Sequence, residues 1–238
     1  NILYLKKVIQ QLGIGTPVEQ IQLTKKAEAH VLVDFKKNVA SIFPNKVKSS
    51  FMKNVKNSYL VIGNSRWHWA FKTKNQWSFL DTSSETEYLQ YLQIPLIAWA
   101  AVGAIPSNVQ LDPNLKIDLK DIPLVNAPSW LGIDRALAAW GALNKAHNSS
   151  NIDPKGLLIA DAGTILSITR IKANGQFIGG QLVPGLHLQL NAMSQRTKNL
   201  KYPTLKSFPT EEFPISTEEA MLKGSLQSLL GTLREAQQ

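Results

Sequence analysis

One pattern occurs twice in this sequence and constrains the fold more than any other feature. Its first copy starts with an apolar run at residues 59–62, followed by a Gly-Asn-Ser turn at residues 63–65. The next run, residues 66–71, alternates aromatic with polar or small side chains, which is typical of a β-strand with one buried face. A Lys-Asn turn then predicts a third strand over residues 76–80.

The second copy follows the same plan later in the chain. An apolar run at residues 157–160 leads into an Asp-Ala-Gly-Thr turn at residues 161–164, and a β-branched run at residues 165–171 follows. The Asn-Gly pair at residues 174–175 is a strong signal for a tight hairpin. It predicts a third strand over residues 176–178.

Each copy therefore predicts a three-stranded antiparallel meander that opens with a glycine-containing turn, with helices after it. Glycine lets the backbone approach a ligand closely, and adjacent N–H groups with a Ser or Thr hydroxyl can bind an anion. A pair of such turns could hold phosphate groups. They could equally be two ordinary hairpins, and the pattern leaves both interpretations open.

Composition places the chain among globular proteins. It has 238 residues, of which 44% are hydrophobic and 18% charged, so a disordered chain, a collagen and a coiled coil are excluded. The longest apolar run, residues 94–105, is interrupted by Pro95 and is shorter than a membrane span, so we expect a buried strand or core segment there. The absence of cysteine excludes disulfides, thiolate zinc sites and cysteine catalysis.

The net charge of +9 is concentrated in the first part of the chain. Residues 1–56 contain ten of the 26 basic residues and three of the 17 acidic ones, while all six Trp lie outside this segment. We interpret residues 1–56 as a solvated N-terminal extension, or as sequence upstream of a natural start at Met52. A basic arm that binds nucleic acid or another anionic surface is the alternative.

A helix rich in Ala and Leu is predicted to begin within residues 128–135 and to end near His147. Asp134 falls in its first turn, where a carboxylate suits the positive end of the helix dipole. Spacing alone favours this structural role. The functional alternative is a carboxylate that accepts a proton from a substrate hydroxyl.

Two further segments allow a structural and a functional interpretation. The glycine-dense residues 178–185 predict a tight connection into a helix over residues 186–196, or a close backbone approach to a ligand. Ser216 and Thr217 open a final helix in a capping-box pattern with Glu219. Thr217 is expected to cap that helix, and a ligand contact is the alternative.

Taken together, four motifs stand in a characteristic order. They are Ile62-Gly-Asn-Ser65, Leu131-Gly-Ile-Asp-Arg135, Asp161-Ala-Gly-Thr164 and Gly179-Gly-Gln-Leu-Val-Pro-Gly185. With the motifs in this order, the sequence from about residue 58 to about residue 230 resembles the type III pantothenate kinases. The residues around the first motif are similar to those of the cyanobacterial members of that family.

The resemblance implies an α/β fold of the duplicated ribonuclease-H-like (actin-like ATPase) type. It implies an extension at residues 1–56, a first half at residues 57–127 and a second half at residues 128–238. The family pattern continues beyond the Thr217 helix, so the second half is expected to be short at its C-terminus. We also expect a cytoplasmic homodimer with no membrane or nucleic-acid partner.

The resemblance further implies transfer of the ATP γ-phosphate to pantothenate, with Mg²⁺ and a monovalent cation (K⁺ or NH₄⁺) as cofactors. Asp134 would be the proton acceptor, and Asp161 would bind the monovalent cation. ATP contacts fall on Ile62, Gly63, Asn64, Ser65 and Thr164. Pantothenate contacts fall on Gly132, Ile133, Asp134, Arg135 and Thr217.

One position departs from the family pattern in the first motif. The family has an aspartate there, whereas this sequence has Val61. A non-catalytic relative that keeps the fold as a binding or regulatory protein is therefore the main alternative to a pantothenate kinase. A different kinase of the same fold is a further alternative, since a fold does not fix a substrate.

Overall fold

The computed structural model describes residues 32–33, 57–72, 77–82, 94–148, 153–204 and 209–238. The chain divides into two compact units. One comprises Asn1–Phe35 and Ala138–Gln238, and the other comprises Lys36–Leu137. The boundary between them falls inside helix α3 (Ile133–Asn148).

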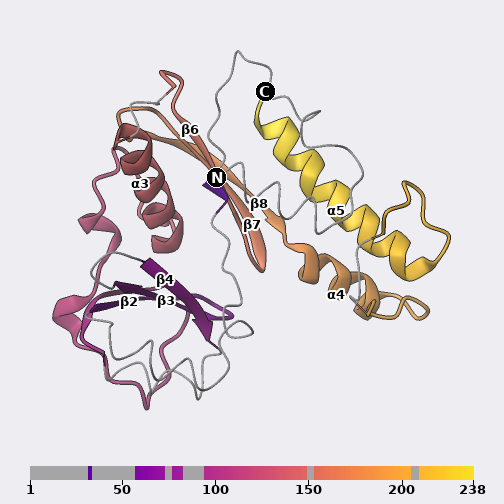
Figure 1. Ribbon diagram of the computed structural model, residues 1–238, viewed down its shortest axis with the longest axis horizontal. Helices are drawn as coiled ribbons and strands as arrows, with labels where there is room; N and C mark the ends of the chain where they lie inside the picture. The colour runs from indigo at the N-terminus through magenta and orange to yellow at the C-terminus, as the bar shows by residue number, and fades with distance from the viewer. Residues whose placement is uncertain (1–31, 34–56, 73–76, 83–93, 149–152, 205–208) are drawn as a thin grey trace. The chain divides into compact units, whose positions relative to one another are not determined.

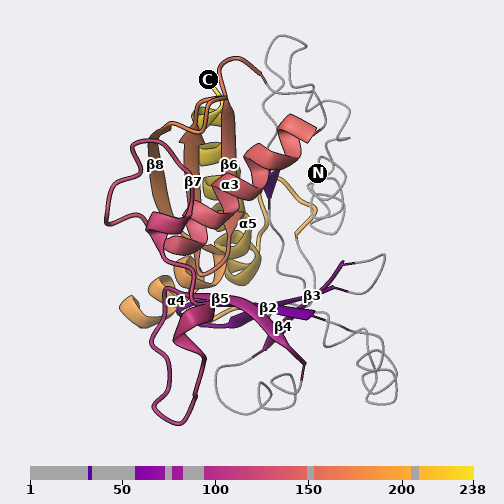
Figure 2. The ribbon, with the colours of Figure 1, turned by 90° about the vertical axis from the view of Figure 1, so that its left-hand side faces the viewer.

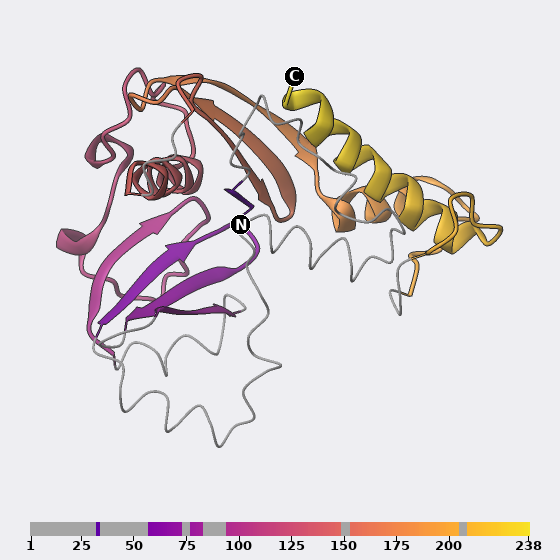
Figure 3. The same cartoon turned by 45° about the horizontal axis from the view of Figure 1, so that its top comes forward.

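The unit Lys36–Leu137 contains the first sheet, whose strands lie in the order β4-β3-β2-β5. The strands are β2 (Asn57–Ile62), β3 (Trp67–Lys72), β4 (Trp77–Thr82) and β5 (Leu96–Ala101). β2, β3 and β4 form the predicted antiparallel meander, and β5 pairs with β2 in parallel. Figure 3 shows these strands side by side. The apolar run at residues 94–105 thus contains a strand, as predicted.

Alternation of side chains along β2 and β3 places the core of this unit on one face of the sheet. Leu60, Ile62, Trp67, Trp69 and Phe71 are each at most 2% exposed. The indole N–H of Trp69 donates a 3.2 Å hydrogen bond to the Thr82 hydroxyl, which satisfies the polar atom of a buried ring. The polar residues that alternate with this set lie on the opposite face of the sheet.

After β5 the chain forms two short 3₁₀ helices, η4 (Pro113–Leu115) and η5 (Leu119–Asp121). Asp112 begins η4 by accepting a hydrogen bond from the Asn114 N–H at 2.9 Å. The predicted helices after the first meander fall partly on residues 83–93, and the N-terminal extension spans residues 1–56. These segments lie outside the described residues, apart from the two-residue strand β1 (Leu32–Val33).

The second sheet lies in the other unit and has the order β1-β6-β7-β8. Its longer strands are β6 (Leu157–Ala162), β7 (Ile165–Ile171) and β8 (Phe177–Pro184). They form the second predicted meander, visible in Figure 2, and β1 pairs with β6 in parallel. Gly175 adopts φ +81° in the hairpin between β7 and β8, so the Asn-Gly turn is confirmed.

β8 differs from the sequence prediction. We expected a strand over residues 176–178 and a turn over residues 178–185, but β8 stays paired with β7 as far as Pro184. The prediction was wrong because glycine and proline are poor strand formers in isolation, whereas β8 is an edge strand, where both are tolerated.

Besides the part of α3 from Ala138 onward, the described residues of this unit form two helices. α4 (Leu186–Arg196) follows β8, as predicted, and α5 (Thr217–Ala236) lies beside it, as Figure 1 shows. Leu190 of α4 packs with Met221 and Leu226 of α5 in one apolar cluster. The C-terminal half of α5 instead packs, through Leu229 and Leu233, on the cluster formed by β6 and β7.

Both sheets have the same arrangement. Each consists of three consecutive antiparallel strands, with a fourth strand parallel to the first of the three. This repetition of one topology confirms the predicted duplicated α/β fold.

Candidate active site

The first predicted phosphate turn joins β2 to β3. Ile62 is fully buried at the end of β2, and the Gly63 N–H donates a 2.9 Å hydrogen bond to the Arg66 carbonyl. A Cβ atom at Gly63 would lie 2.9 Å from that carbonyl oxygen, so the turn leaves no room for a side chain there. Asn64 and Ser65 are exposed at its tip.

A second glycine supports this turn from the end of β5. The Gly103 N–H donates to the Ile62 carbonyl at 3.2 Å, and a Cβ atom at Gly103 would collide with the carbonyl of Gly63. The close approach of two backbones therefore fixes the turn. Gly103 was not among the predicted site residues, although its place directly after an apolar strand was the available signal.

The second predicted phosphate turn joins β6 to β7 and is built in the same way. The Gly163 N–H donates to the Ile165 carbonyl at 3.0 Å, and Thr164 is exposed. The Gly185 N–H donates to the Thr164 carbonyl at 2.8 Å. A Cβ atom at Gly185 would collide with the carbonyls of Gly163 and Thr164. The approach to a ligand considered for the glycine-dense segment stays a prediction, and the close contact that Gly185 makes is with this turn.

Asp161 lies near the end of β6, opposite Ser167 of β7, and is half-buried. A partly buried carboxylate beside a turn is a suitable oxygen donor for a cation. Among the described residues, no group of three or more His, Cys, Asp or Glu could hold a metal ion. Asp161 thus offers a single carboxylate at this turn, without a cluster of further ligands among the described residues.

Asp134 lies in the first turn of α3. Gly132 directly precedes the helix, and its carbonyl accepts a 3.0 Å hydrogen bond from the Ala136 N–H. The Asp134 Oδ1 accepts the N–H of Arg135 at 2.8 Å, so the carboxylate is oriented by the helix start. A Cβ atom at Gly132 would lie 2.7 Å from this oxygen, so a side chain there would require the Asp134 carboxylate to shift. Ile133, the first residue of the helix, is buried.

Arg135 is half-buried beside Asp134. Burial lowers the pKa of its guanidinium, and the negative charge of Asp134 acts in the opposite direction. A partly desolvated guanidinium gains more from an anionic partner than an exposed one does. The pair thus presents an oriented carboxylate and a half-buried guanidinium on consecutive residues.

Ser216 rather than Thr217 caps α5, so the expected capping role of Thr217 was wrong. The Ser216 hydroxyl accepts the Glu219 N–H at 3.3 Å and donates to the Glu219 carboxylate at 3.0 Å. Thr217 is the first helical residue and is exposed. Its side chain is therefore accessible to a ligand.

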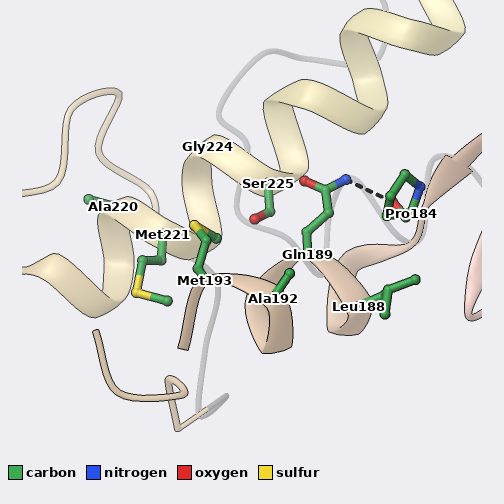
Figure 4. Close-up of a pocket in the computed structure, with 9 residues that line it drawn as sticks. All are labelled: Pro184, Leu188, Gln189, Ala192, Met193, Ala220, Met221, Gly224 and Ser225. Atoms are coloured by element: carbon green, nitrogen blue, oxygen red, sulfur yellow. Dashed lines mark hydrogen bonds between the residues drawn. The ribbon is translucent and has the colours of Figure 1, made fainter. Parts of the chain in front are cut away.

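A pocket of about 400 Å³ lies between α4 and α5 (Figure 4). Its lining is mostly apolar and includes Leu188, Met193 and Met221. The Gln189 amide donates a 2.8 Å hydrogen bond to the Pro184 carbonyl at one end. The Ser225 hydroxyl points toward the pocket and is buried without a hydrogen-bond partner. The pocket was not predicted, because it depends on the packing of two helices distant in the sequence.

The structure joins some predicted site residues and leaves others on separate elements. Ile62, Gly63, Asn64 and Ser65 form one turn, and Gly132, Ile133, Asp134 and Arg135 form one helix start. Thr164 lies in the turn that Gly185 supports, and Asp161 lies near the end of β6, which leads into that turn. Thr217 lies on α5. None of the described helices combines the length and apolar character needed to cross a bilayer.

Comparison with known proteins gives a consistent result. The family model described as type III pantothenate kinase matches residues 108–238. The type III pantothenate kinase of Synechococcus elongatus is 31% identical over 74% of both chains. The corresponding protein of Thermosynechococcus vestitus is 32% identical over 69% of this chain and 64% of its own length. That of Nostoc sp. is 30% identical over 77% of this chain and 76% of its own.

Among solved structures, the activator of 2-hydroxyisocaproyl-CoA dehydratase from Clostridium difficile with bound ADPNP aligns with a TM-score of 0.33. It is 11% identical and covers 76% of this chain and 68% of its own, a similarity too low to build on. The sequence relatives and the family model, by contrast, agree with the motif order found in the sequence. The chain therefore belongs to the type III pantothenate kinase family and is a kinase.

Proposed function

We propose that this chain transfers the γ-phosphate of ATP to the terminal hydroxyl of pantothenate, giving 4'-phosphopantothenate and ADP in the first step of coenzyme A biosynthesis. The observation that carries the proposal is the family match, which spans the helix start with Asp134 and the second turn with Thr164. The bond between the γ-phosphorus and the bridging oxygen breaks, and a bond to the pantothenate oxygen forms.

Asp134 takes the proton that the hydroxyl releases in this step. Its Oδ1 is held by the N–H of Arg135, so the carboxylate keeps its orientation as the substrate arrives. Phosphoryl transfer depends mainly on positioning and charge neutralisation, so the acceptor need only orient the hydroxyl and take its proton late. Gly132, Ile133, Arg135 and Thr217 would contact pantothenate, with Arg135 supplying a cation for an anionic group of the substrate.

The two turns would hold ATP. Ile62, Gly63, Asn64, Ser65 and Thr164 supply backbone N–H groups, an amide and hydroxyls, which are suitable donors for phosphate oxygens. Asp161 would hold the monovalent cation, and Mg²⁺ would be held largely by the phosphates. When bound, these cations neutralise phosphate charge. We further propose a homodimer, the assembly implied by the resemblance.

The decisive measurement is ADP release from ATP and Mg²⁺, with and without pantothenate, in potassium, ammonium and sodium buffers. We expect release that requires pantothenate and either potassium or ammonium. Pantothenate-independent release would contradict the substrate, and equal rates in sodium would contradict the cation role of Asp161.

Substitution of Asp134 tests the proton acceptor. Asp134→Asn should lower kcat by about 10²–10⁴-fold, the usual contribution of a general base, with little change in thermal stability. Asp153→Asn, on an exposed turn where the carboxylate accepts the Lys155 N–H, is the matched control. Full activity of Asp134→Asn would reduce Asp134 to its role at the start of α3.

Val61 supports the alternative of a non-catalytic relative, because it removes a carboxylate from the first motif. That alternative predicts nucleotide binding without turnover by a folded protein. Calorimetric titration with ADP, alongside the ADP-release measurement, separates the two functions.

A further inference from the structure

The face of the first sheet opposite its aromatic core carries a row of three cross-strand neighbours. The register places Val61 of β2 opposite His68 of β3, and His68 opposite Asp81 of β4. Side chains opposite each other on neighbouring strands point to the same face. His68 therefore lies between Val61, where the family has an aspartate, and the carboxylate of Asp81.

His68 and Asp81 form a short polar contact. The His68 Nδ1 lies 2.7 Å from the Asp81 Oδ1, and the two side chains are 15% and 6% exposed. The other carboxylate oxygen, Oδ2, is buried without a hydrogen-bond partner. A buried carboxylate is costly unless a charged or donating partner compensates it, and the His68 ring is in place to do so.

The opposite edge of the ring faces the first phosphate turn. The His68 Nε2 would lie 3.1 Å from a Cβ atom at Gly63, so the ring packs directly against this glycine. With the Nδ1 proton donated to Asp81, Nε2 is the nitrogen directed toward the turn that carries Asn64 and Ser65. By binding Nδ1, Asp81 orients the His68 ring so that Nε2 faces the turn.

We propose that His68, oriented by Asp81, is a phosphate-binding residue of this kinase. Its Nε2–H donates a hydrogen bond to a phosphoryl oxygen of the nucleotide at the turn formed by residues 63–65. The bound ring then lies between two hydrogen-bond acceptors, the Asp81 carboxylate and the phosphate. This inference rests on the proposed function, because it takes ATP as the ligand of the turn.

Val61 is compatible with this role. An aspartate at this position would lie directly opposite His68 and would compete with the phosphate for the ring. The apolar valine leaves the imidazole to interact with Asp81 and the ligand. On this face of the sheet, the polar side chains next to Val61 are therefore His68 of β3 and Asp81 of β4.

The test uses the full chain with ¹⁵N-labelled histidine, observed by NMR during titration with ADP and, separately, with adenosine. The spectrum of His68→Gln assigns the His68 signals. We expect the Nε2 resonance of His68 to shift with ADP and to stay in place with adenosine, which has no phosphate. A structural role in joining β3 to β4 would not produce that difference.

Binding affinities give the second measurement. We expect His68→Gln to weaken ADP binding by about tenfold, the scale of one charge-assisted hydrogen bond, and to leave adenosine binding unchanged. Asp81→Asn should weaken ADP binding in the same direction. His147→Gln is the matched control, since this histidine contacts the Ala173 carbonyl at the far end of α3.

The outcomes separate this inference from the proposed function. Unchanged ADP affinity in His68→Gln, or an unshifted Nε2 resonance in the ADP-bound protein, would overturn the role of His68 alone. Nucleotide binding without pantothenate-dependent turnover would overturn the proposed function. The Nε2 resonance and the ADP affinity of His68→Gln would still decide the role of His68. Failure of the unmodified chain to bind ADP would overturn both.

Discussion

At the scale of single residues, glycine marks the places where one backbone rests on another. Gly103 touches the first turn and Gly185 touches the second, and in both cases a side chain would occupy the position of a carbonyl group. Some helical glycines have no such neighbours. A Cβ atom at Gly141 or at Gly231 would meet nothing within 4 Å. Replacing glycine with alanine is therefore expected to lower stability at the first kind of position and to raise it at the second.

Gly185→Ala should lower the free energy of unfolding by about 1–3 kcal/mol, the usual effect of forcing extra volume into a packed site. It should also weaken ATP binding, because the second turn must shift. Gly231→Ala, in the open part of α5, should raise stability by about 0.5–1 kcal/mol through its higher helix propensity. Urea unfolding of both variants checks the sign, and equal effects would contradict the close approach at Gly185.

Local motifs identify some site residues, whereas others depend on contacts between strands. Asp134 and the glycines of both turns could be named from local motifs. The pairing of His68 with Asp81 could not, because it depends on the register between β3 and β4. A shift of one residue would place His68 opposite a neighbour on the other face.

At the scale of elements, one serine directly before α5 and one within it have contrasting environments. Ser216 precedes the helix and pairs with Glu219, while Ser225 is buried at the pocket with an unsatisfied hydroxyl. The first arrangement stabilises a helix start, and the second imposes a desolvation cost.

Ser216→Ala should destabilise the protein by about 1 kcal/mol through loss of the N-cap. Ser225→Ala should leave stability unchanged or raise it by about 1 kcal/mol, since a buried donor with no acceptor is removed. Thermal unfolding of the two single variants is the measurement. A large loss in Ser225→Ala would indicate that its hydroxyl is satisfied in solution.

Strong local signals made most elements predictable. Alternation identified β2 and β3, the Asn-Gly turn located the hairpin between β7 and β8, and the start of α5 followed from its capping pattern. β8 was underestimated because its length depends on pairing with β7, which local propensity does not reveal. The pairing of β1 with β6 and of β5 with β2 likewise joins segments that are distant in the sequence, so local signals do not reveal it.

At the scale of the whole molecule, charge is unevenly distributed along the chain. Residues 1–56 hold most of the net positive charge, and the rest of the chain is nearly neutral. Any affinity for anionic polymers should therefore reside in this segment and should fall with salt.

Replacing the ten lysines of residues 1–56 with glutamine should make the protein leave a heparin column at clearly lower salt. Pantothenate-dependent turnover should be retained, because none of the proposed site residues lies in this segment. Retention on heparin unchanged by the substitutions would place the anion-binding charge elsewhere in the chain.

The two sheets differ in the order in which their paired strands are synthesised. In the first sheet β5 follows the three strands that it joins, so all four are synthesised within one continuous stretch. In the second sheet β1 precedes β6 by more than half of the chain and must await the strand with which it pairs. Closing so long a loop is slower and entropically more costly than pairing neighbours. The first sheet can therefore be assembled during synthesis, whereas the second is completed only after much of the protein has been made.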